Sequence, residues 1–118
     1  MKINKFIKLI LFPVIFLTGN IAFAQLNNPV ICKIYGSVYL EQDPKKADFK
    51  VYLESSEAFA DLIVFIQNNR LYADKAGLWY LTESPNIADF RIYITESKKN
   101  ADFTICYTKT ESFAGCPR

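Results

Sequence analysis

The chain has 118 residues, of which 51% are hydrophobic and only four are glycine, so its composition is that of one globular domain and argues against a disordered or low-complexity protein. The formal net charge is +2, but three of the fourteen basic residues lie within the first ten positions. Without them, eleven basic residues face twelve acidic ones, and no basic stripe is left to hold phosphates. A nucleic acid is therefore not expected as a partner.

The first segment of the chain has the pattern of a secretory signal. Its three lysines are followed by an apolar run over 9–17 and by small residues that end at Ala24. The run contains Pro13 and is shorter than the roughly 20 residues that a membrane-spanning helix needs. We therefore expect a signal peptide over 1–24, no membrane insertion after cleavage, and a secreted or periplasmic domain over 25–118.

The rest of the chain repeats one short unit. An apolar-aromatic-apolar phrase returns at steps of 13, 13, 15, 13 and 13 residues, centred on Tyr39, Tyr52, Phe65, Tyr80, Tyr93 and Cys106. Upstream of five of these phrases stands Ala-Asp, with the aspartates Asp48, Asp61, Asp74, Asp89 and Asp102, and Ala114-Gly115 forms a degenerate sixth copy. Each unit has the period-2 alternation of a strand and is followed by a polar turn.

This pattern predicts an all-β domain of six short strand-and-turn repeats. Alternate residues such as Phe49, Val51 and Leu53 form the core face. The opposite face carries the aromatic stripe and is too apolar to be plainly solvent-facing, which suggests two layers wound closely around each other. Because a parallel crossover normally needs a dozen or more residues, the spacing favours a meander or a narrow coil.

Three cysteines follow the predicted signal. Cys106 stands where the other repeats have an aromatic residue, so we interpret it as a small buried hydrophobe. Cys32 and Cys116 lie near the two ends of the domain and are the favoured disulfide pair in an oxidising compartment, although spacing alone leaves Cys106 with Cys116 open.

The repeats resemble the septoil-knot domain, a small bacterial domain of unknown function. The resemblance rests on the serial Ala-Asp followed by a Val-Tyr-Leu-like phrase, on the single extended copy over 73–80 with its Gly-Leu-Trp-Tyr segment, and on Ala114-Gly115. It implies an all-β fold tied in a seven-crossing torus knot, and it brings no catalytic residues. The family pattern often ends in Ala-Gly-Trp, whereas Cys116 follows Ala-Gly here, which makes a terminal disulfide plausible.

No residue pattern indicates an enzyme. The chain has no histidine, which removes the commonest general base, the usual nucleophile pairs and imidazole zinc sites. Ser97 beside Lys98 is formally a Ser-Lys pair, but lysine-rich polar turns are normally solvated. A carboxylate-based cell-wall hydrolase is the remaining catalytic alternative, and it would need two carboxyl groups in unlike environments.

The repeated aspartates have two interpretations. In the first, each of them accepts hydrogen bonds from backbone amides at the turn into a strand. In the second, pairs of them converge on calcium, which takes carboxylate oxygens, although the glycine-rich context of calcium-binding repeats is missing. The first interpretation is preferred, so no cofactor or metal site is predicted.

A candidate ligand groove lies at the extended repeat. Gly77, Trp79 and Tyr80 are its least repeated residues, and aromatic side chains there could stack on a sugar or a peptide. The alternative is that the aromatic residues simply pack across strands.

Together these observations predict an exported, non-enzymatic β domain that acts as a structural or interaction module of high kinetic stability, since a threaded chain must be unthreaded to unfold. Its partner would be an envelope protein or a glycan. The alternatives are a module that binds envelope carbohydrate, peptide or calcium, and the hydrolase.

Overall fold

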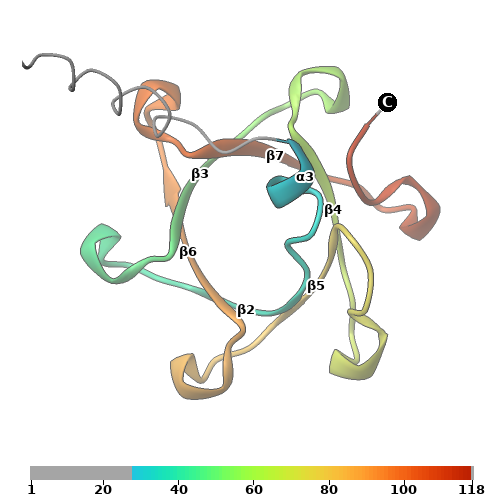
Figure 1. Cartoon of the computed structure of the whole chain (residues 1–118), viewed down its shortest axis with the longest axis horizontal. Helices are drawn as coiled ribbons and strands as arrows, with labels where there is room; N and C mark the ends of the chain where they lie inside the picture. Colours follow the sequence, from blue (N-terminus) through green and yellow to red (C-terminus); the bar gives the residue numbers. More distant parts are fainter. Residues whose placement is uncertain (1–27, 118) are drawn as a thin grey trace, which may run out of the picture.

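The computed structural model describes residues 28–117 (Figure 1). The predicted signal over 1–24 lies outside the described residues. The described chain has a short helix, α3 (Asn28–Ile31), followed by strands that alternate with 3₁₀ helices. The strands are β2 (Gly36–Leu40), β3 (Phe49–Leu53), β4 (Leu62–Ile66), β5 (Leu78–Leu81), β6 (Phe90–Thr95) and β7 (Phe103–Tyr107). The 3₁₀ helices are η2 (Pro44–Lys46), η3 (Glu57–Phe59), η4 (Arg70–Tyr72), η5 (Pro85–Ile87), η6 (Lys98–Asn100) and η7 (Glu111–Phe113).

Each turn between strands is built by a side chain that accepts a hydrogen bond from the amide two residues ahead. In the first three turns this side chain directly precedes the 3₁₀ helix, as in Asp43, Ser56 and Asn69. In the last three turns a threonine two positions earlier takes over the role: Thr82, Thr95 and Thr108. The alanine of each Ala-Asp mark ends the helix, because its amide donates to the carbonyl of the first helical residue.

The strands form a closed barrel in the order β2-β5-β4-β7-β3-β6, and each strand is parallel to both of its neighbours. Strands that follow one another in the chain generally lie two positions apart, so β2, β3 and β4 alternate with β5, β6 and β7 around the ring (Figure 1). The expected coil is confirmed and the meander is wrong. A short connection between consecutive strands is sufficient because a strand generally pairs with strands three or four repeats away and not with the strand that follows it in the chain.

The single longer repeat has a specific role in this order. Between β4 and β5 the chain advances by one ring position, and these are the only consecutive strands of the described chain that pair directly. Their connection over 67–77 is longer than the connection over 54–61, in line with the longer crossover that neighbouring parallel strands need. This single step of one position places β5, β6 and β7 in the gaps between β2, β3 and β4.

The core is a ring of equivalent positions. The fully buried side chains include one from the same position of each repeat: Val38, Val51, Val64, Trp79, Ile92 and Ile105. Ile31 and Ile34, from the segment before β2, join this core, and the Trp79 indole Nε1 donates to the carbonyl of Ile34 at 3.1 Å. The two layers expected from the sequence are the opposite walls of this one barrel.

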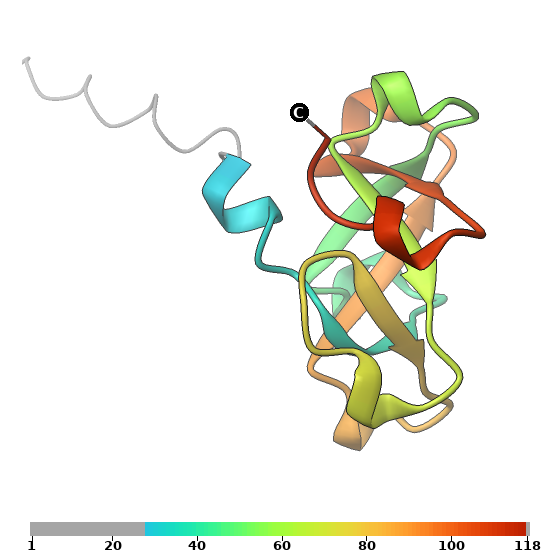
Figure 2. The same ribbon diagram turned by 90° about the vertical axis from the view of Figure 1, so that its right-hand side faces the viewer.

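The turns project outward around the barrel (Figures 1 and 2). Around the rim their order is η6, η3, η7, η4, η5, η2, which differs from the order in the chain (Figure 1). Turns distant in sequence, such as η7 and η4, are therefore neighbours on the surface.

Candidate functional site

Four of the five repeat aspartates connect neighbouring strands. The amide of Asp89, just before β6, donates to the Ser37 carbonyl of β2 at 2.8 Å, and the Ser37 amide donates back to Asp89 Oδ2 at 2.9 Å. The same reciprocal pair of bonds joins Asp48 to Arg91, Asp61 to Thr104 and Asp102 to Lys50. In each case an aspartate that precedes one strand binds the second residue of an adjacent strand, and we call this arrangement the aspartate clamp.

The aspartate clamp refines the preferred interpretation of these residues. The carboxylates do accept backbone amides, but the amides lie 43 or 52 residues away rather than in the local turn. Asp74 has no clamp because three residues separate it from β5. Over residues 28–117, no three of the histidine, cysteine, aspartate and glutamate side chains gather where they could share a metal ion.

The extended repeat does not form the groove suggested for it. Trp79 has 0% of its surface exposed and is hydrogen-bonded inside the core, so it cannot stack on a ligand. Tyr80 is half-buried, and Gly77 is buried against Ile63 and Gly115. The reason is that Trp79 occupies the position of the core valines and isoleucines. A hollow of about 390 Å³ does lie beside this repeat, lined by Lys75, Ala76, Leu78, Glu111, Ser112 and Ala114.

The outer aromatic stripe is only partly covered. Tyr39, Tyr52, Phe65, Tyr80 and Tyr93 are all half-buried, whereas Cys106, at the same repeat position, is buried. Desolvation by burial raises the pKa of the Cys106 thiol, which keeps it protonated and a poor nucleophile.

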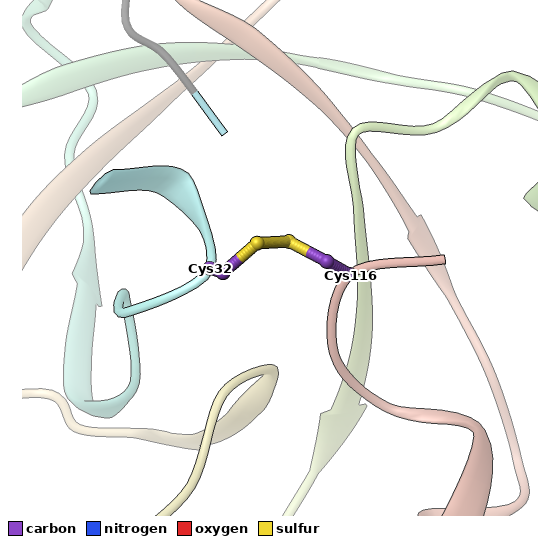
Figure 3. The surroundings of a disulfide bond; sticks show 2 residues. All are labelled: Cys32 and Cys116. Carbon is purple, nitrogen blue, oxygen red and sulfur yellow. A yellow bond between two sulfur atoms is a disulfide. The ribbon is translucent and has the colours of Figure 1, made fainter. Parts of the chain in front are cut away.

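The predicted disulfide is confirmed. Cys32, just after α3, is bonded to Cys116, just after η7, with their Cα atoms 5.4 Å apart (Figure 3). The bond joins the two ends of the described chain, and Cys106 stays free as expected.

Two ion pairs fix turns against the barrel. Arg91 lies 3.6 Å from Glu41, and the Lys98 ammonium lies 2.7 Å from Glu54. The hydrogen bond and the charge of Glu54 raise the pKa of Lys98. The charged form of Lys98 is therefore favoured, whereas the base of a Ser-Lys pair would have to be neutral.

The turn tips carry exposed apolar side chains that the sequence analysis missed. Phe59, Tyr72, Ile87 and Phe113 are the last residues of η3, η4, η5 and η7, and all are exposed, as is Leu71 at 75%. The signal was present in the sequence: in four repeats a large apolar residue precedes the Ala-Asp or Ala-Gly mark, and the corresponding residues of η2 and η6 are Lys46 and Asn100.

The tips divide the rim into two parts. The four turns with apolar tips, η3, η7, η4 and η5, follow one another around the barrel and form what we call the apolar arc (Figure 1). The remaining neighbours, η2 and η6, contain Lys45, Lys46, Lys98 and Lys99 and form the lysine arc (Figure 1).

Comparison with known proteins identifies the fold. The family model of the 7(1) septoil knot domain matches residues 31–117, a range that contains all six strands and both disulfide cysteines. No curated protein matches the chain. The all-β, knotted fold implied by the resemblance is confirmed. In the described residues no helix has the length and apolar character needed to cross a bilayer.

Proposed function

The chain belongs to the septoil knot family. We propose that its domain is an exported, non-enzymatic module that combines high kinetic stability with an interaction surface. Export to the periplasm or beyond is supported by the disulfide, which forms and persists in oxidising compartments. A non-enzymatic role is supported by the absence of histidine and by the use of four repeat aspartates in backbone hydrogen bonds.

The observation that carries the interaction role is the apolar arc. Its tip side chains contribute little to the core, and the recurrence of large exposed apolar side chains on four successive turns of the rim supports a binding surface. The hollow beside Lys75 and Glu111 is lined on one side by η7 and on the other by the start of β5 and the connection that leads to it from η4.

The partner is a second copy of the chain, because the molecule also carries a complementary surface. Lysine side chains pack their aliphatic stems on aromatic rings and attract the ring faces. The apolar arc offers three such rings, Phe59, Tyr72 and Phe113, with Glu57 and Glu111 in the same helices. The helices of the lysine arc contain four lysines and no acidic residue.

The middle of the apolar arc, at η7 and η4, lies across the ring from the lysine arc (Figure 1). A contact between the apolar arc of one copy and the lysine arc of the next is therefore heterologous, and it leaves one arc of each kind free for further copies. Two lysine arcs would repel each other. We expect head-to-tail association that does not stop at the dimer.

Sedimentation velocity over a concentration series tests this proposal. The wild-type protein is expected to form species larger than dimers as its concentration rises towards about 1 mM, the range of weak association. Leu71→Ser with Tyr72→Ser removes the apolar tip of η4, in the middle of the apolar arc. Lys46→Glu with Lys99→Glu reverses one charge in each helix of the lysine arc. Each double variant alone is expected to stay monomeric. Mixed together they form a one-to-one dimer and nothing larger, because each supplies one intact arc.

Lys33→Glu is the matched control for charge, since Lys33 is an exposed lysine that precedes β2 and lies outside both arcs. This variant is expected to associate like the wild type. A wild-type protein that stays monomeric at every concentration, or two double variants that do not pair when mixed, contradicts the proposed partner.

A further inference from the structure

The position of the disulfide has a topological consequence. Cys32 and Cys116 are separated by 84 residues, and all strands and 3₁₀ helices of residues 28–117 lie between them. The septoil knot match over 31–117 extends only one residue beyond each cysteine. The crossings of the knot are therefore formed by the same segment that the disulfide closes.

We propose that the Cys32–Cys116 disulfide seals the knot, so that the oxidised protein stays knotted even when it is fully unfolded. An open knotted chain unties when one end slips back through its loops. A covalent ring has no end that can do so, and denaturants and heat do not break its bonds. The residues outside the ring are tails that can move without changing its topology.

This role differs from the ordinary effect of a disulfide. Cross-linking a segment of this length lowers the entropy of the unfolded chain and thereby stabilises the native state. A sealed knot also alters the folding pathway, because the unfolded ring no longer has to thread an end. Refolding then requires only that strands pair and the core repacks.

The proposal also fixes the order of events in the first folding of the chain. Threading has to precede disulfide closure, because a ring closed on an unthreaded chain is unknotted and cannot reach the native fold. Closure itself is an exchange: the two cysteine thiols form one S–S bond, and a small-molecule disulfide takes up the two electrons and two protons and leaves as two thiols.

The exposure of the three cysteines is compatible with threading before disulfide closure. Cys32 and Cys116 are both half-buried in the folded domain, which leaves them within reach of a thiol or disulfide reagent. Cys106 is buried in β7, so the third cysteine is kept out of the exchange once the barrel has formed.

Two samples of the same covalent structure test the proposal. Both come from the full chain made by chemical synthesis with Cys106→Ala, which leaves one pair of cysteines. The first sample is folded while reduced and then oxidised. The second is oxidised in concentrated guanidinium chloride before it has ever folded. Peptide mapping confirms that Cys32 is bonded to Cys116 in both.

Both samples are then held in guanidinium chloride without reductant, diluted together, and followed by fluorescence of Trp79, the single tryptophan. We expect the first sample to refold at a rate that does not depend on the time it spent unfolded. The second is expected to refold at least tenfold more slowly or not at all, until a reductant opens its ring.

Equal refolding of the two oxidised samples would overturn the proposal, as would a refolding rate of the first sample that falls with time in denaturant. If the synthetic chain with Cys106→Ala does not fold while reduced, the oxidised wild-type protein replaces the first sample, and a never-folded wild-type chain with the same mapped disulfide replaces the second. Equal refolding of these two samples would again overturn the proposal, and slower refolding of the never-folded chain would support it.

Discussion

At the scale of single residues, the aspartate clamp explains why Asp recurs with the repeat. Each clamp satisfies two backbone groups of one strand pair at the edge where the second strand begins, and it does so between segments that are far apart in sequence. Hydrogen bonds to a charged acceptor are stronger than neutral ones. At four of the five repeat positions the carboxylate is thus used to join two strands.

Replacement of Asp89 measures the strength of one clamp. Asp89→Ala leaves the Ser37 amide without its acceptor, and we expect a loss of about 1 to 2 kcal/mol in the free energy of unfolding. Asp89→Asn keeps an oxygen acceptor and is expected to lose less. Asp74→Ala is the matched control, since Asp74 is exposed and forms no clamp. Equilibrium unfolding in urea gives the three values, and equal losses for Asp89→Ala and Asp74→Ala would contradict this role of the carboxylate.

At the scale of elements, the connection between β4 and β5 is the irregular part of the coil and also the place where the chain end is held. The C-terminal segment forms an antiparallel bridge between Gly115 and Ile63 of β4, with hydrogen bonds of 2.8 Å in both directions. Gly77 packs directly against this bridge. The longer repeat therefore sets the strand order and supports the segment that leads to Cys116.

Two glycine substitutions separate these effects. Both Gly77 and Gly115 have positive φ, so alanine at either position is strained by about 1 to 2 kcal/mol. At Gly115 an added Cβ would lie 3.6 Å from the nearest atom, whereas at Gly77 it would collide with backbone atoms of Ile63 and Gly115. Gly77→Ala is thus expected to lower the free energy of unfolding clearly more than Gly115→Ala. Thermal and urea unfolding measure the loss for each variant. A similar loss for the two would show that the bridge between Gly115 and Ile63 can shift to accommodate the added Cβ.

At the scale of the whole molecule, the barrel is held together by contacts between residues distant in sequence. Strands pair with partners three or four repeats away, apart from β4 with β5. Such contacts slow folding, because the chain must close long loops before they form. The reverse process is also slow in a knotted chain, because the loops remain threaded through one another while their contacts break.

We therefore expect an unfolding rate in water below about 10⁻⁵ s⁻¹, at the slow end of small domains. Stopped-flow and manual-mixing experiments in guanidinium chloride give this rate by extrapolation of the unfolding arm. The variant Cys32→Ser with Cys116→Ser provides the comparison without the ring, and its unfolding should remain slow because the open chain is still threaded. Unfolding within seconds in moderate denaturant would contradict the expected kinetic stability.

The sequence by itself determined the local features of this protein. The spacing of apolar and aromatic residues located the six strands, the polar runs located the turns, and the cysteine positions indicated the terminal disulfide. These features depend on residues close together in the chain: side chains alternate across a strand, and short polar side chains cap the turns that follow. The knot was expected from the resemblance to a family and not from the periodicity of the sequence.

Only the tertiary structure decided which strands are partners, and much follows from that order. It placed Ser37, rather than a local amide, opposite Asp89, and it turned Trp79 into a core residue at a position where smaller residues recur. It also gathered η3, η7, η4 and η5 into one arc (Figure 1). Because strand order is fixed by how the coil closes on itself, over separations of 43 to 52 residues, a repeat of 13 residues carries no information about it.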